Sequence, residues 1–300
     1  MPYCPYCGSE TSNDDAFCRS CGAMLYGGPA PQRPPKGSAN TKIIAFVIVG
    51  IILVSGLAGA IAILAMNAMS EDITRTYEWN YNGQDFKYSL TVKRSDYNRM
   101  MDSDIDRTGS VSTDRYIDEN GRTVFAVSDY VVTDGYIKKV SADLATLYKE
   151  RFGAEPTNSE YTKFAMMFVR LVTEYDYDEA EGGGEYWRYP LETLFEKLGD
   201  CEDTSILLAA LLNARGIRAG VILAPSHAMC AVCSDQLAPD TYSNERYSEI
   251  HFDGYPSGVH YYAIETTVDQ FWNIGDISDS MGVVYMHLYL GSTDDYYFKS

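Results

Sequence analysis

Basic residues are scarce in this 300-residue sequence, which has 24 Lys and Arg against 42 Asp and Glu. The shortage is concentrated after residue 70, where 20 basic and 39 acidic residues give a net charge of about −19. An acidic field of this size repels phosphate backbones. It excludes nucleic acid as the expected partner of this part of the chain and predicts a solvated acidic surface.

Charge is absent altogether between Ile43 and Met66, a stretch of apolar and small residues. A helix of this length, at about 1.5 Å per residue, crosses a bilayer core of about 30 Å, so we expect one transmembrane helix. Basic residues precede it and Glu71 and Asp72 follow it, which predicts a cytoplasmic N-terminus and an extracellular C-terminal part. Small residues at four-residue spacing are compatible with a homodimer through this helix: Ser55, Gly56, Gly59 and Ala60.

Four of the seven cysteines form two pairs near the N-terminus, Cys4 with Cys7 and Cys18 with Cys21. Two intervening residues allow both thiolates of a pair to bind one tetrahedral ion, and a segment this short needs a metal to fold. Because disulfides are disfavoured on the cytoplasmic side, the sequence predicts a structural Zn²⁺ site. Residues 2–24 resemble the short zinc ribbons found at the N-termini of many prokaryotic membrane proteins. The Pro- and Gly-rich residues 25–42 would be a linker.

The acidic part begins with strand patterns and continues with helix patterns. Aromatic residues alternate on both sides of Asn82-Gly83, which predicts a β-hairpin, and shorter strand patches follow between Val111 and Val132. Residues 137–153 predict an amphipathic helix that stops at Gly153. Residues 157–175 predict a second helix, whose apolar stripe would be Phe164, Met167, Phe168, Leu171 and Val172.

Cys201 stands at the start of a further helix that is apolar on nearly every face and is therefore expected to be surrounded by protein. The N–H groups and the positive dipole at a helix start favour thiolate over thiol. His227 opens a later strand, and Glu265 lies on a third strand at a position where the alternation asks for an apolar residue. A thiol, an imidazole and a carboxylate drawn from three such segments are what nucleophilic acyl transfer requires.

The stretches GDCEDTSILLAALLNARGI, HAMCAV and YYAIETT resemble the transglutaminase-like superfamily, and most closely its membrane-anchored archaeal and bacterial members and cysteine peptidases. The resemblance covers about residues 185–290. It implies an α+β, papain-like core in which a helix bearing the cysteine packs on an antiparallel sheet. It also implies Cys201 as nucleophile, His227 as base and Glu265 in place of the usual aspartate, with residues 234–258 as an insertion.

Several residues near this motif allow a second interpretation. The acids Asp200, Glu202 and Asp203 could cap the helix, which we favour. Alternatively, Asp200 and Glu202 could hold Ca²⁺, as in calcium-dependent relatives. Asp269 is the alternative carboxylate. The remaining cysteines and histidines are expected to be surface or core groups: Cys230, Cys233, His251, His260 and His287.

The resulting prediction is a single-pass membrane protein with a cysteine enzyme outside the cell, acting on protein or peptide amides. Hydrolysis is preferred to amine transfer, and a true crosslinking transglutaminase is an alternative. A non-catalytic binding or scaffold module of the same fold is the rival hypothesis. The predicted domains are residues 1–24 (zinc ribbon), 25–42 (linker), 43–69 (transmembrane helix), 70–135 (β-rich part) and 136–300 (transglutaminase-like domain).

Overall fold

The computed structural model describes residues 72–112, 114–176, 185–238, 259–267, 273–276 and 287–294. They all belong to a unit that spans Met66–Ser300. The predicted zinc ribbon, linker and membrane segment lie outside the described residues, so those three predictions stay as they are. Within the described part, none of the helices combines the length and the apolar composition needed to span a bilayer.

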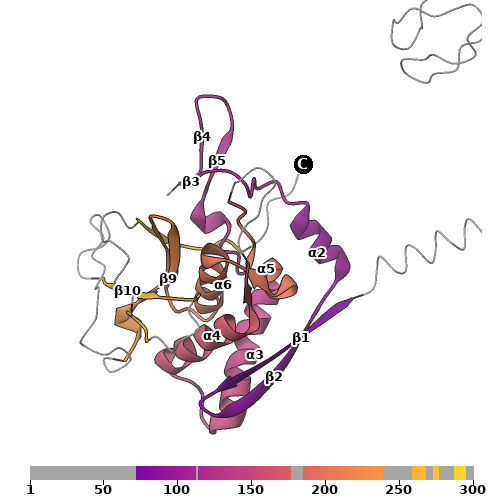
Figure 1. Ribbon diagram of the computed structural model, residues 1–300, viewed down its shortest axis with the longest axis vertical. Helices are drawn as coiled ribbons and strands as arrows, with labels where there is room; N and C mark the ends of the chain where they lie inside the picture. Colours follow the sequence, from indigo (N-terminus) through magenta and orange to yellow (C-terminus); the bar gives the residue numbers. More distant parts are fainter. Residues whose placement is uncertain are drawn as a thin grey trace, which may run out of the picture. The chain divides into compact units, whose positions relative to one another are not determined.

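A long β-hairpin opens the described chain, as predicted (Figure 1). Strand β1 (Ile73–Tyr81) pairs with β2 (Gln84–Val92) in an antiparallel register. Both turn residues, Asn82 and Gly83, have positive φ angles of 51° and 73°, as a two-residue hairpin turn of type I′ requires. The inward-facing aromatic side chains of the hairpin pack on the helices behind it; Trp79 meets Phe168 edge-on at 4.9 Å between ring centroids.

Helix α2 (Arg94–Met101) follows the hairpin and was not predicted. Its sequence is mostly polar and only Met100 is buried, so no apolar periodicity marks it. Short strands come next, within the segment where strand patches were expected, and they pair in the order β3-β5-β4. Their bounds are β3 Val111–Ser112, β4 Tyr116–Ile117 and β5 Thr123–Ala126, with a 3₁₀ turn η1 at Val127–Asp129.

Both helices that the periodicity predicted before the thiol are present. Helix α3 (Gly135–Phe152) ends at Gly153, which adopts φ 84°, and helix α4 (Asn158–Val172) starts with a capping box between Thr157 and Glu160. The predicted stripe of α4 is wrong at one position, because Leu171 is 49% exposed. The other stripe residues are buried or partly buried, since they face the aromatic residues of the hairpin and the central helix.

Helix α6 (Cys201–Ala214) is the central element, and every residue from Glu202 to Leu212 is buried. It contacts α3, α4, α5, β8 and β9. Figure 1 shows α6 between these helices and β9. The sheet is antiparallel in the order β10-β9-β8-β11. A cysteine-bearing helix packed on an antiparallel sheet is thus present in a mixed α/β fold.

The remaining bounds are β6 Glu174–Tyr175, α5 Pro190–Glu196, β7 Leu198–Gly199, β8 Ala219–Ala224, β9 His227–Cys233, η2 Ser234–Gln236, β10 Tyr261–Ile264 and β11 His287–Leu290.

Candidate active site

Cys201 is the first residue of α6, as predicted, but the surroundings of its thiol do not favour the expected thiolate. Its Sγ donates a hydrogen bond to Glu202 Oε2 at 3.2 Å, and the structure shows no hydrogen bond between it and His227. Burial raises the pKa of the thiol, and the Glu202 and Asp200 carboxylates raise it further; the backbone N–H of Ala228 only partly offsets them. The expectation of a thiolate is therefore wrong for this arrangement, because burial and two neighbouring acids outweigh the helix start.

His227 and Glu265 lie together, as the predicted set of thiol, imidazole and carboxylate requires. The imidazole Nε2 is 2.7 Å from Glu265 Oε2. His227 opens β9 directly after a tight turn at Ser226 (φ 59°), and Glu265 follows β10, the neighbouring strand. A ring held through Nε2 has its other nitrogen, Nδ1, left to exchange a proton with a nucleophile.

Thr267 holds the Glu265 carboxylate in addition to His227. Its Oε1 accepts hydrogen bonds from the Thr267 backbone N–H at 3.0 Å and from the Thr267 hydroxyl at 2.7 Å. Burial acts to raise the pKa of Glu265, but the hydrogen bonds from His227 and Thr267 outweigh it and hold the pKa below its usual value. The acid in an apolar pattern is thus an ionised carboxylate with partners, as a buried charge must be.

Arg170 fixes the backbone at the same place. Its Nε donates to the Glu265 carbonyl at 2.8 Å, and its Nη2 donates to the same oxygen. Arg170 lies on α4, 95 residues earlier in the sequence. Sequence reasoning missed it, because one arginine on an amphipathic helix carries no signal of a contact so distant in sequence.

Thr266 joins the end of β10 to the first turn of α6. Its hydroxyl lies 2.8 Å from that of Thr204 and 3.3 Å from that of Ser205. Those two hydroxyls in turn donate to the backbone carbonyls of Asp200 (2.7 Å) and Cys201 (2.6 Å). A continuous set of hydrogen bonds therefore connects the turn that carries the thiol with the strand end that carries the carboxylate.

The acids beside the thiol serve different purposes. Asp200 is the N-cap residue of α6, but its side chain makes no capping hydrogen bond, so the favoured capping interpretation is wrong for Asp200. Asp203 instead accepts from the Arg188 backbone N–H at 2.8 Å and from its guanidinium at 2.6 Å. That pair attaches the segment before α5 to the first turn of α6.

Glu202 and Asp200 form the one group of possible metal ligands found within the described residues, together with Cys201. One ligand atom from each of the three lies within 4.8 Å of the other two. Glu202 Oε1 is buried and accepts no hydrogen bond from the described residues. Burial raises the pKa of Glu202, and the neighbouring carboxyl groups of Glu185 and Asp200 raise it further.

The other candidate groups do not join this site. Cys230 and Cys233 are buried and belong to the hydrophobic clusters on opposite faces of β9, as expected for core residues. His287 is exposed on β11. Asp269 and His251 lie outside the described residues, so the alternative carboxylate is not placed.

Two parts of the chain match known family profiles. A family profile described as the transglutaminase-like superfamily matches residues 148–251, about a third of the chain, and a zinc-ribbon domain profile matches residues 3–25, which include all four N-terminal cysteines. No match is found among curated proteins.

One matching crystal structure is of a protein from Cytophaga hutchinsonii that is provisionally described as a cysteine protease. It is 16% identical, with a TM-score of 0.24, and the match covers 54% of this chain and 60% of that one, less than two thirds of its length. A score this low establishes no common fold. The family profile nevertheless supports a cysteine-type enzyme, and the zinc-ribbon profile suggests zinc binding.

Proposed function

We propose that the protein is a cysteine enzyme that hydrolyses protein or peptide amide bonds through Cys201, His227 and Glu265. The observation that carries the proposal is the 2.7 Å contact between His227 and Glu265. The residue after Glu265, Thr266, is hydrogen-bonded to Thr204 in the helix turn that bears the thiol. A buried carboxylate that orients an imidazole beside a helix-start cysteine is the constellation of a thiol acyltransferase.

The geometry supports a sequence of proton movements. For catalysis the Cys201 side chain leaves its acceptor on Glu202, and the thiol proton passes to His227 Nδ1 while Glu265 stabilises the imidazolium through Nε2. The sulfur attacks the amide carbonyl carbon, and the imidazolium returns its proton to the departing amine, leaving a thioester. Water then attacks the thioester with His227 as base, which releases the acid and regenerates the thiol.

The reaction products decide between hydrolysis and amine transfer. The full-length chain, incubated with casein and dansylcadaverine, is expected to release casein fragments and to attach little dye, because water resolves the thioester. Fragments are counted by mass spectrometry and dye by fluorescence of the casein band, with Cys201→Ala as the blank. Dye attachment without fragments would instead identify a crosslinking transglutaminase.

One observation favours the non-catalytic rival. Burial and the neighbouring acids raise the pKa of the thiol, which donates a hydrogen bond to Glu202 and none to the imidazole. This arrangement would suit a domain that binds peptides without cleaving them. Hydrogen bonds of catalytic groups are often long or misaligned before substrate binds. Activity of the Cys201 and His227 variants, treated in the Discussion, separates the two hypotheses.

We also propose that Asp200 and Glu202 hold Ca²⁺. Calcium takes oxygen ligands, and here two buried carboxyl groups adjoin each other, one with an oxygen that no described residue satisfies. Bound there, the ion would neutralise the two acids beside the thiol. It would also occupy the carboxylate that accepts the Cys201 proton, which favours release of the sulfur towards His227.

Removing calcium should therefore lower both activity and stability. We expect EGTA to reduce casein hydrolysis by at least about tenfold and to lower the melting temperature, and added Ca²⁺ to restore both, since a ligand that binds the folded state stabilises it. Glu202→Gln should abolish the calcium-dependent shift in melting temperature, whereas Glu119→Gln, an exposed turn residue, should preserve it. A melting temperature that does not respond to Ca²⁺ in the unsubstituted protein would refute the site.

The predicted location completes the proposal. The uncharged segment Ile43–Met66 would anchor the chain in the membrane, with the Zn²⁺-binding ribbon of Cys4, Cys7, Cys18 and Cys21 in the cytoplasm and the enzyme outside. Its substrate would then be an extracellular protein or peptide. Recovery of the full-length chain in the soluble fraction after cell lysis would contradict the anchor.

A further inference from the structure

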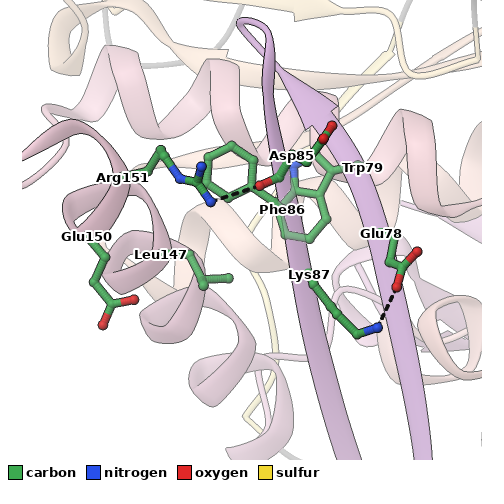
Figure 2. Close-up of a pocket in the computed structure, with 8 residues that line it drawn as sticks. All are labelled: Glu78, Trp79, Asp85, Phe86, Lys87, Leu147, Glu150 and Arg151. Atoms are coloured by element: carbon green, nitrogen blue, oxygen red, sulfur yellow. Dashed lines mark hydrogen bonds and ion pairs between the residues drawn. The ribbon is translucent and has the colours of Figure 1, made fainter.

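A hollow of about 760 Å³ lies between the hairpin and α3, and none of its lining residues belongs to α6, β9 or β10 (Figure 2). Strand β2 forms one wall, with β1 behind it, and one side of α3 forms the other. The lining residues are Glu78, Trp79, Asp85, Phe86, Lys87, Leu147, Glu150 and Arg151. We refer to this hollow as the hairpin groove.

The wall formed by β2 is an edge of a two-stranded sheet, and no further described strand pairs with it. In a hairpin closed by Asn82-Gly83 the flanking pair, Tyr81 and Gln84, is hydrogen-bonded across the strands, so the next residue, Asp85, directs its N–H and C=O outward. The structure agrees, because Arg151 Nη2 donates to the Asp85 carbonyl at 3.0 Å from α3. By the same alternation, Lys87 directs its N–H and C=O away from β1 and towards the groove.

The side chains of the groove combine an apolar floor with charges at its rim. Phe86 and Trp79 stack at 5.3 Å between ring centroids, and Leu147 faces them from α3. The Trp79 indole N–H is buried and has no acceptor among the described residues, so the floor carries an unsatisfied donor.

Acids outnumber bases at the rim, where Glu78, Asp85 and Glu150 face Lys87 and Arg151. Lys87 pairs with Glu78 at 2.6 Å. Arg151 donates to the Gln84 amide oxygen and to the Asp85 backbone carbonyl, and the Asp85 carboxylate accepts from the Asn80 amide at 2.8 Å. Glu150 forms no ion pair with any described residue. Within the described residues, Glu150 therefore has no basic partner, the Trp79 N–H has no acceptor and the outer edge of β2 has no paired strand.

We propose that the hairpin groove binds an extended peptide segment that adds as a third strand to the edge of β2. The segment would carry an apolar side chain for the Phe86 and Leu147 walls and a basic side chain for Glu150. An unpaired strand edge beside an apolar hollow is the arrangement used in peptide recognition by strand addition, in which the main chain supplies affinity and the side chains supply specificity. This inference rests on the proposed function: the occupant would be a part of the peptide substrate distant from the bond that Cys201 attacks.

Binding can be measured without catalysis. The full-length Cys201→Ala protein is titrated against a fluorescein-labelled eight-residue peptide of alternating Thr and Val, with a central Leu-Thr-Lys, and anisotropy gives the Kd. Bound peptide should slow hydrogen exchange of the Lys87 amide, since this group would donate to the added strand. Glu150→Lys should weaken binding about tenfold through like-charge repulsion with the peptide lysine, and Glu119→Lys, on the β4–β5 turn, should not.

Two further peptides make the test strict. Methylating the backbone nitrogen of the central leucine should abolish binding, and replacing the peptide lysine by glutamate should restore affinity for Glu150→Lys. Unchanged exchange at Lys87, or equal affinity of the plain and methylated peptides, would overturn the proposal. If the peptide binds as expected while casein hydrolysis is absent, the groove stands and the proposed hydrolysis fails.

Discussion

Cys201→Ala and His227→Ala should each lower kcat/KM for casein-derived peptides by about 10⁴-fold or more, equivalent to at least about 5 kcal/mol of transition-state stabilisation. Removing the sulfur removes the group that forms the thioester, and removing the imidazole leaves a protonated thiol whose pKa is raised by burial and two acids. The measurement is the rate of cleavage of a fluorogenic peptide, compared with the folded fraction by circular dichroism.

A double variant tests whether the two residues act as one unit. Cys201→Ala combined with His227→Ala should be no slower than either single variant, because residues of one catalytic unit are strongly non-additive. Cys230→Ala is the matched control, since it removes another thiol from β9 without touching the site, and it should keep most of the activity. An unsubstituted protein that is no more active than Cys201→Ala would instead support the binding-module hypothesis.

Asp203→Ala should lower the free energy of unfolding by about 3 kcal/mol, since it leaves the Arg188 guanidinium, 13% exposed, without its closest carboxylate. The substitution also removes the acceptor of the Arg188 backbone N–H. Urea unfolding is followed at pH 8, because burial and Asp200 raise the pKa of Asp203 to about 7 even though Arg188 lowers it. Above that pH the carboxylate is ionised and the pair is complete.

The control for this prediction is an ion pair of the same type on the surface. Glu155 binds Lys149 at 2.8 Å, but both side chains are more than half exposed. Glu155→Ala should therefore leave the unfolding midpoint unchanged within error. Equal effects of the two substitutions would show that burial does not set the strength of the Arg188–Asp203 pair.

The elements that the sequence predicted are those with strong local signals. Alternation around Asn82-Gly83 located the hairpin, the 3.6-residue period and Gly153 located α3, and a run of apolar residues located α6. Helix α5 was missed because its single useful signal, Pro190 at the first helical position, stands in a short segment without a period. Glu265 was noticed because it broke a pattern, and it does contact His227.

The residues that support the site could not be found in this way. Arg170 and Thr266 act through contacts with residues far along the chain, and neither residue type is unusual in its segment. The state of the thiol was also wrongly expected, because the helix start can be read from sequence whereas burial and the direction of the Glu202 side chain cannot. Local order is therefore predictable here, and long-range polar contacts are not.

Glu265, the carboxylate partner of His227, follows it by 38 residues in the sequence. The backbone carbonyl of Glu265, to which Arg170 donates, lies 95 residues after that arginine. During synthesis, which proceeds from the N-terminus, Cys201, the proposed nucleophile, therefore leaves the ribosome well before Glu265, which orients His227. A nascent chain that ends before residue 265 would contain the thiol without an oriented imidazole. The proposed catalytic set is complete only in a chain whose β10 is paired with β9. On this proposal, the unfinished chain has no complete site with which to attack itself or its neighbours.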